Sequence, residues 1–526
     1  MLSFRLDFDL PEALCRPSRG RVRDARTERR RRALPAVLAA LVLWTASSGA
    51  RAGLLDDIPV GLGYAAWDLC TRVLAAGDDE ARVRTRYTEP KVHPLAWLWR
   101  VRWGTDEVEV RTWLPVPSWR RLAVHRPGLG CTLVTPGQTR AAWATSQTAL
   151  SSRPAGAAGA ASVNGAPADG RTPAPSGSLP WPRGEGPANL TTIAHTALPA
   201  ELERASAALF AETTDQPRAR QNTQAVLVLY RGQLVYERYA PGYDARSLLT
   251  GWSMTKSLTA LWAGALQGRG VLQLDEPLGL PAWRGTDKAA ITWRHALNLA
   301  PGLAWDEGHS GFSAVSDMMF SHGDHAAYAA AVPLEAAPGT RFNYSTGTSA
   351  LIGAAIRHKL GGNPQRTVDS LWQDLLTPLG IRDGFVELDA TGTPATGARG
   401  VFRARDWLRL GELVRLEGQW QGRSVVPAAF VRFMRAPSPA NPGYGAGLRL
   451  YDTALMPAAT PRDVAYFTGL MGQYMVILPG EQLVLLRMGV SLDKEETRRR
   501  VFEAALALAR AANEPRAPVL AQGLTR

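Results

Sequence analysis

Four short apolar segments constrain the fold more than any other feature, two of them within residues 225–239 and two within residues 474–488. The predicted strands are residues 225–230, 234–239, 474–478 and 483–488. Arg231 and Gly232 separate the first pair, and Pro479 and Gly480 separate the second pair. Such short, glycine-containing connections are typical of β-hairpins. Two hairpins with a long block between them favour an antiparallel sheet.

Helical patterns precede, separate and follow the two hairpins. Residues 199–212 and 495–512 have the apolar spacing of amphipathic helices, and residues 253–266 form a further predicted helix. A mostly helical, loop-rich block runs on to about residue 440. Because the first and last helices can cover one face of the sheet, the predicted fold class is α+β. It consists of an antiparallel β-sheet flanked by helices plus a helical subdomain, with an extra block at the N-terminus.

The N-terminal residues 1–52 have the features of an export signal. Four arginines at 29–32 precede an apolar run at 33–44, and Ala50-Arg51-Ala52 fits a cleavage site. The run is short for a bilayer span, and the charged segment before it is long. We therefore predict a signal peptide or an N-terminal anchor, and a periplasmic or extracellular location. Membrane contact is expected only through that anchor if it stays uncleaved.

The rest of the chain divides by composition into further segments. A helix is expected at 64–75, with strands at 107–110 and 122–124, whereas residues 151–188 are dominated by Ser, Pro, Gly and Ala. The predicted segments are an α/β accessory region at 53–150, a Pro/Gly/Ala/Ser-rich linker at 151–196, a main domain at 197–515 and a C-terminal tail at 516–526.

Charge and cysteine content exclude several classes of partner and cofactor. The formal net charge is +13, but residues 1–32 supply much of it and no basic stripe interleaved with aromatics follows. No nucleic acid partner is predicted. Cys70 and Cys131 are an even pair in a chain that has an export signal, so a disulfide is expected between them. Neither belongs to a C-x-x-C pair, and no metal site is predicted.

A serine and a lysine three residues apart occur at the start of the predicted helix 253–266. In this position Lys256 lies on the same helical face as Ser253 and can act as the base that a serine nucleophile needs. The alternative is a helix N-cap followed by a solvated lysine. The same pattern recurs at Ser491 and Lys494, where an N-cap is the preferred interpretation.

The surrounding sequence resembles the β-lactamase-related serine hydrolases, in the branch of class C β-lactamases and 6-aminohexanoate-dimer hydrolases. The similar segments occur in one order over about residues 200–512: 236–243, 249–257, 338–345, 404–411 and 469–473. The resemblance implies an antiparallel sheet flanked by helices, a helical subdomain and a nucleophilic serine between them.

The resemblance also implies roles for residues outside the serine–lysine pair. Tyr344 matches the tyrosine that relays a proton, although by itself it fits a packed loop aromatic. Gly469 and Leu470 match the strand facing the serine, with the Leu470 N–H as an expected oxyanion donor. Phe467 stands where the family usually has Lys or His. The loss of that cation argues against tight recognition of a substrate carboxylate.

The sequence therefore predicts a serine hydrolase that cleaves a small amide or ester through an acyl-enzyme on Ser253, without a cofactor. One alternative is a penicillin-recognising β-lactamase or D-Ala-D-Ala peptidase. Another is a non-catalytic envelope binding or scaffold protein with the same fold.

Overall fold

A computed structural model describes residues 54–113, 116–146, 150, 181, 182, 184–186, 193, 196–212, 214–308 and 311–514. From Asp56 onward these residues form one compact unit. The predicted export signal and C-terminal tail lie outside the described residues, and so does most of the predicted linker. Among the described helices, none is long and apolar enough to cross a membrane.

A six-stranded antiparallel sheet forms the centre of the main domain. Its spatial order is β12-β13-β14-β15-β5-β6. Its strands are β5 (Thr223–Tyr230), β6 (Gln233–Tyr239), β12 (Arg449–Leu450), β13 (Ala465–Gly469), β14 (Gln473–Leu478) and β15 (Leu483–Gly489). Strand β15 pairs with β5, so the two predicted hairpins join into one sheet across most of the domain. The predicted strands and the α+β class are confirmed.

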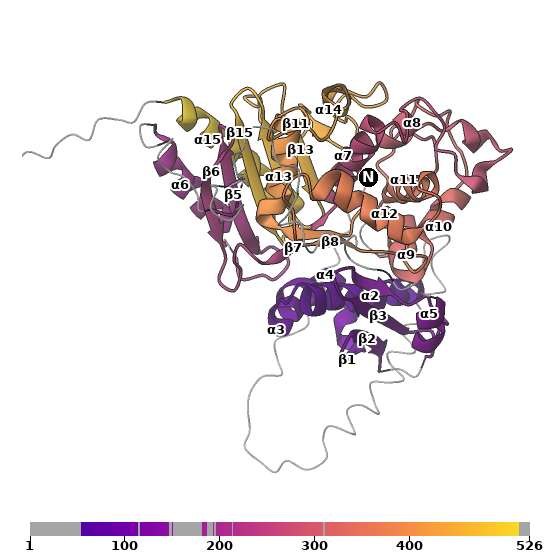
Figure 1. The fold of residues 1–526 in the computed structure, drawn as a ribbon. Coiled ribbons are helices and arrows are strands. Elements are labelled where there is room, and N and C mark those ends of the chain that lie inside the picture. The colour runs from indigo at the N-terminus through magenta and orange to yellow at the C-terminus, as the bar shows by residue number, and fades with distance from the viewer. Residues whose placement is uncertain are drawn as a thin grey trace, which may run out of the picture. The chain divides into compact units, whose positions relative to one another are not determined.

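Helices cover both faces of this sheet. Helices α6 (Leu198–Phe210) and α15 (Lys494–Asn513) pack on one face, and α7 (Met254–Gly268) and α13 (Ala404–Arg415) pack on the other (Figure 1). Side chains alternate along a strand. In β5, Val226 and Val228 belong to the core with α6 and α15, whereas Leu227 and Leu229 belong to the core with α7 and α13. This two-sided burial explains why β5 is apolar throughout.

The block between the hairpins contains mainly helices, as predicted. Its helices are α8 (Trp293–Leu297), α9 (Ala314–Ser321), α10 (His325–Ala331), α11 (Thr346–Lys359), α12 (Pro364–Leu371) and α14 (Ala428–Arg435). A small antiparallel sheet has the order β7-β9-β8, from β7 (Leu248–Trp252), β8 (Phe385–Val386) and β9 (Gly400–Arg403). A further hairpin joins β10 (Gln419–Trp420) and β11 (Arg423–Ser424).

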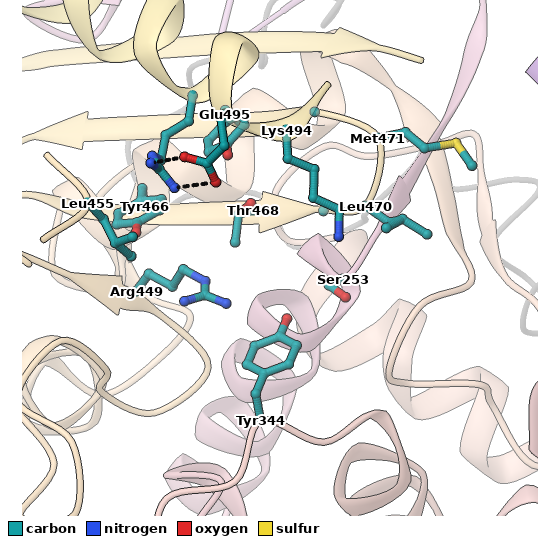
Figure 2. Close-up of a pocket in the computed structure, with 14 residues that line it drawn as sticks. Ser253, Tyr344, Arg449, Leu455, Tyr466, Thr468, Leu470, Met471, Lys494 and Glu495 are labelled. Atoms are coloured by element: carbon teal, nitrogen blue, oxygen red, sulfur yellow. Dashed lines mark hydrogen bonds and ion pairs between the residues drawn. The ribbon is translucent and has the colours of Figure 1, made fainter. Parts of the chain in front are cut away.

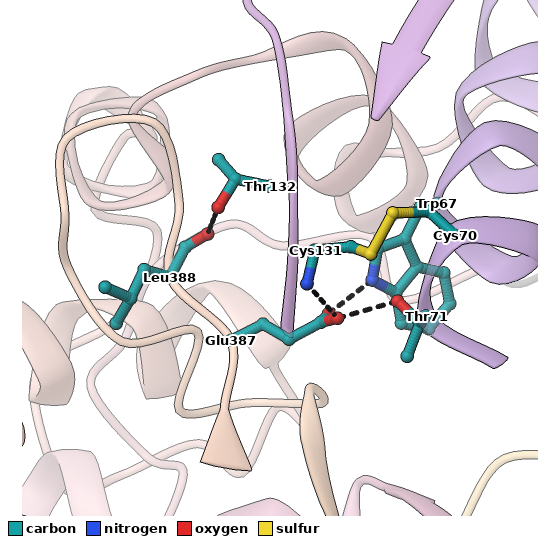
Figure 3. The surroundings of a disulfide bond; sticks show 7 residues. All are labelled: Trp67, Cys70, Thr71, Cys131, Thr132, Glu387 and Leu388. Atoms are coloured by element: carbon teal, nitrogen blue, oxygen red, sulfur yellow. Dashed lines mark hydrogen bonds between the residues drawn. A yellow bond between two sulfur atoms is a disulfide. The ribbon is translucent and has the colours of Figure 1, made fainter. Parts of the chain in front are cut away.

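The accessory region combines helices with a four-stranded antiparallel sheet. The helices are α2 (Leu54–Leu69), α3 (Glu80–Arg82), α4 (Glu89–Val92) and α5 (Arg140–Ser146). The strands, in spatial order, are β1 (Trp99–Trp103), β2 (Glu107–Thr112), β3 (Arg120–Arg126) and β4 (Gly130–Leu133). Cys70, directly after α2, forms a disulfide with Cys131 of β4, as expected from the sequence (Figure 3).

A buried carboxylate joins the accessory region to the main domain beside this disulfide. Glu387 accepts hydrogen bonds from the Trp67 indole N–H, from the Thr71 hydroxyl at 2.6 Å and from the Cys131 backbone N–H at 2.8 Å (Figure 3). Burial raises the pKa of Glu387, and the nearby Arg399 guanidinium opposes that rise. The Glu387 carboxylate of the main domain therefore accepts three hydrogen bonds from the accessory region, and the two regions belong to one compact unit.

Candidate active site

Ser253 lies at the turn where β7 passes into α7. Trp252, the last residue of β7, has φ +49°, in the left-handed region that bulky residues rarely adopt. Helix α7 begins at Met254, one residue after the predicted start, with Ser253 as its N-cap. The Ser253 side chain makes no capping hydrogen bond. Ser253 therefore occupies the N-cap position without using its hydroxyl to cap the helix.

Lys256 is buried beneath Ser253, and its side chain is only 4% exposed. Its Nζ donates hydrogen bonds to the Ser253 hydroxyl at 3.2 Å, the Thr346 hydroxyl at 2.8 Å and the Gly397 carbonyl at 2.8 Å. These contacts exclude a solvated lysine. They hold an amine within hydrogen-bonding distance of the serine, as general-base activation requires.

Glu307 is a carboxylate of this site that the sequence interpretation missed. Its Oε1 lies 3.9 Å from the Lys256 Nζ, and its side chain is 12% exposed. It accepts hydrogen bonds from the Thr346 hydroxyl, from the Thr346 N–H at 2.8 Å and from the Trp305 indole N–H at 2.6 Å. Glu307 belongs to no recognised motif, and only the folded loop brings it beside α11. It fixes Thr346, which in turn fixes Lys256.

Tyr344 lines the same pocket as Ser253. Figure 2 shows its hydroxyl directed toward the serine. The Lys256 Nζ lies 4.9 Å from the centre of the Tyr344 ring, and the Arg449 guanidinium carbon lies 4.8 Å from it. The Tyr344 ring therefore lies beside two basic side chains. The structure thus brings Ser253, Lys256 and Tyr344 together, as the resemblance implied.

Strand β13 and the turn after it form another wall of the pocket. Gly469 and Leu470 both line it together with Ser253. A Cβ atom at position 469 would clash with the Gly251 carbonyl oxygen, so a glycine is required for β13 to approach β7. The Phe467 side chain is fully buried in the core, whereas Thr468, next in the chain, lines the pocket.

Three cations that the sequence interpretation did not assign to the site line this pocket, which has a volume of about 290 Å³: Arg449, Lys494 and Arg498. Arg449 comes from β12, and Lys494 comes from the first turn of α15 (Figure 2). Neither forms an ion pair with a carboxylate of the described residues, whereas the neighbouring Arg498 pairs with Glu495. The pocket thus contains cations although Phe467 replaces the one that the family usually has on this strand.

The second serine–lysine pattern has a different structure from the one predicted. Asp493, not Ser491, is the N-cap of α15, because its side chain accepts the Glu496 N–H. Ser491 is fully buried, and its hydroxyl donates to the Gln221 carbonyl. Asp493 takes the cap because α15 begins at Lys494, later than an N-cap at Ser491 requires. No group of metal-ligating side chains occurs in the described part of the chain.

The sequence model of the Beta-lactamase family matches residues 208–510, more than half of the chain. A search of the curated proteins finds no match.

Many solved structures are similar to the chain, and three of them serve as examples. The first is a 6-aminohexanoate-dimer hydrolase homologue from Bacillus anthracis, with 17% identity, TM-score 0.45 and coverage of 55% of this chain and 79% of that one. The second is a penicillin-binding protein homolog from Caulobacter crescentus, with 17% identity, TM-score 0.43 and coverage of 59% and 96%. The third is a family VIII carboxylesterase, with 16% identity, TM-score 0.45 and coverage of 60% and 96%. The family match over the main domain shows that the chain belongs to the Beta-lactamase family and is a hydrolase.

Proposed function

We propose that the protein is a serine hydrolase that cleaves a small amide or ester through an acyl-enzyme on Ser253. The observation that carries this proposal is the buried Lys256 amine, whose Nζ lies 3.2 Å from the Ser253 Oγ. Burial keeps this amine away from bulk water, and three fixed acceptors orient it. In its neutral form, a lysine held in this way can serve as the base for a serine nucleophile.

In the proposed mechanism, Lys256 takes the hydroxyl proton as the Ser253 Oγ attacks the substrate carbonyl carbon. The negative charge that develops on the carbonyl oxygen is stabilised by backbone N–H groups of Ser253 and Leu470. Tyr344 passes the proton held by Lys256 to the leaving amine or alcohol as the bond to the leaving group breaks. Water then attacks the acyl-enzyme and gives one proton to Lys256, which returns it to the Ser253 oxygen as the acid leaves.

A fluorophosphonate probe and p-nitrophenyl acetate test this proposal. We expect wild-type protein to be labelled and to hydrolyse the ester, and Ser253→Ala to do neither. Ser491→Ala is the matched control, because Ser491 has the same sequence pattern but is buried and bonded to Gln221. Labelling that survives in Ser253→Ala contradicts the proposal. No labelling of folded wild-type protein favours the non-catalytic scaffold alternative instead.

A penicillin-recognising enzyme is the second candidate, and two of the pocket cations favour it. A β-lactam and a peptidoglycan stem peptide both carry a carboxylate, and Arg449 and Lys494 offer it charge-assisted hydrogen bonds. Fluorescent penicillin separates the candidates. A stable or turned-over adduct on Ser253 supports recognition of penicillin, and its absence beside active ester hydrolysis supports the general amidase or esterase.

We also propose that the protein is exported. The disulfide between Cys70 and Cys131 supports this location, since disulfides persist in oxidising compartments. Fractionation of cells that express the full chain tests the location. Recovery of the protein in the cytosolic fraction with both thiols reduced contradicts it.

A further inference from the structure

A second, smaller cavity opens at Ser253, and neither Arg449 nor Lys494 lines it. Its volume is about 50 Å³, and it is lined almost entirely by apolar atoms. The two cavities share Ser253 and Leu470. An ester or amide bound with its carbonyl at Ser253 therefore meets a large cationic space on one side and a small apolar space on the other.

The wall of the small cavity comes from both regions of the protein. The main domain supplies Trp252, Met319 and Phe320, and the accessory region supplies Tyr64 and Lys91. The Tyr64 ring stacks on Trp252 with 6.2 Å between ring centres and meets Phe320 edge-on at 5.6 Å. Because Tyr64 is only 4% exposed, its ring is a fixed wall of the cavity.

Close backbone packing holds this wall in position. A Cβ atom at residue 63 would clash with the Phe320 carbonyl oxygen, so Gly63 allows α2 to approach α9 directly before Tyr64. Trp67, one helical turn later, meets the Trp252 ring at 5.0 Å and donates its N–H to Glu387. The accessory region is thus anchored on both sides of the point where it meets the cavity.

The size of the cavity limits what it admits. A water molecule needs about 10–15 Å³ by this measure, and benzene fits a cavity of about 150 Å³. At about 50 Å³, the cavity lies between these limits and suits a short aliphatic chain. A charged or strongly polar group is disfavoured there because its desolvation would not be repaid.

We propose that the accessory region and the main domain together form an acyl pocket that admits a short apolar acyl group of about two to four carbons. The pocket selects the acyl side of the substrate, and the cationic cleft holds the leaving group. This inference rests on the proposed acyl-enzyme at Ser253, and it makes the accessory region part of the active site.

The test compares kcat/KM for p-nitrophenyl acetate, butyrate and hexanoate. Wild-type protein should prefer acetate and butyrate. Met319→Ala should raise the hexanoate-to-acetate ratio about tenfold, since a methylene in an apolar pocket changes specificity by roughly that factor or more. Met318→Ala is the matched control, because Met318 is an equally buried methionine of α9 that does not line the cavity. An equal change in both variants, or none in Met319→Ala, overturns the proposal.

The contribution of the accessory region is tested with Tyr64→Ala and with the milder Tyr64→Leu. Both should raise the same ratio, whereas Tyr87→Ala should not, since Tyr87 is a buried tyrosine of the accessory region that lies outside the cavity. Thermal melting of each variant confirms folding. If the hexanoate-to-acetate ratio is unchanged in folded Tyr64→Leu, the acyl-pocket inference is overturned. The proposed function is not affected by that result as long as ester hydrolysis still depends on Ser253. Loss of any such hydrolysis in wild-type protein overturns both.

Discussion

The Nζ atom of Lys256 lies 3.2 Å from the Oγ atom of Ser253, and the lysine side chain is almost completely shielded from water. Replacement of Lys256 by alanine removes the base and leaves the serine as a weak nucleophile. We expect kcat to fall by about 10²–10⁴-fold in steady-state ester hydrolysis. Lys359→Ala is the control, because Lys359 pairs with Glu276 far from the site and should keep full activity. A Lys256→Ala variant with more than a tenth of wild-type kcat would argue against this role.

Glu307 acts on the same lysine through Thr346. Glu307→Gln keeps the shape of the side chain but removes the charge that lies 3.9 Å from the Lys256 Nζ and accepts the Thr346 N–H. We expect kcat to fall by about 10–100-fold, because charge-assisted hydrogen bonds contribute roughly 1.5–3 kcal/mol, with little change in KM. Asp306→Asn, at the neighbouring carboxylate that accepts the Gly308 N–H, is the matched control. Equal losses in both variants would indicate only a disturbed loop.

Local sequence patterns predicted part of this site, and the remaining residues are brought to it only by the tertiary fold. The hairpins and the Ser253–Lys256 pair follow from short-range periodicity, which a sequence displays directly. Glu307 and Arg449 come from segments that only the tertiary fold brings to the serine. The two serine–lysine patterns illustrate the limit, because Ser253 opens on a pocket and Ser491 is fully buried. The two serines differ in burial, and the spacing of serine and lysine in the sequence does not predict burial.

The accessory region shows the same limit on a larger scale. Its cysteine pair, predicted from an even cysteine count, is confirmed, whereas the helix expected at 64–75 begins earlier, as α2 (Leu54–Leu69). Its contact with the cavity at Ser253 depends on Tyr64, an ordinary apolar position of α2. Nothing in its sequence distinguishes a tyrosine that lines a cavity from one such as Tyr87 that packs elsewhere.

Lys494 is expected to recognise negative charge on the substrate. Lys494→Met should lower kcat/KM about tenfold or more for an ester that carries a carboxylate on its leaving group, such as 4-acetoxybenzoate, because a charge-assisted hydrogen bond of roughly 1.5–3 kcal/mol is lost. The neutral p-nitrophenyl butyrate serves as the internal control and should change much less. An equal fall in kcat/KM for both esters would show that Lys494 maintains the structure of the site but does not recognise the charge of the substrate.

The disulfide should contribute strongly to the stability of the folded unit. Cys70 and Cys131 are 61 residues apart. Closing a loop of that length lowers the entropy of the unfolded chain, which raises its free energy by about 4 kcal/mol at 25 °C. The double variant Cys70→Ala/Cys131→Ala should lose a free energy of unfolding of that order in urea. Wild-type protein with reductant should unfold at the same lower urea concentration. An unchanged midpoint in both experiments would contradict the contribution.

Lys91 gives the folded protein a distinctive dependence of stability on pH. Burial, and next the charge of Lys494, lower the pKa of Lys91 from 10.5 to about 8. The unfolded chain then binds more protons than the native state between these values, so stability rises with pH across that window. The charged form costs the native state up to about 3 kcal/mol below pH 8, at about 1.36 kcal/mol per pKa unit.

Lys91→Met removes this cost. In urea unfolding, the stability of the variant relative to wild type should be greatest near pH 7 and should shrink as the pH rises toward 10.5. Titrating groups distant from Lys91 are common to both proteins and cancel in the difference, so the trend reports Lys91 together with its coupling to Lys494. Lys288→Met is the control, because Lys288 is more shallowly placed at the Ala330 carbonyl, and burial lowers its pKa less. A difference between Lys91→Met and wild type that stays constant from pH 7 to pH 10 would show that Lys91 is not desolvated beside Lys494.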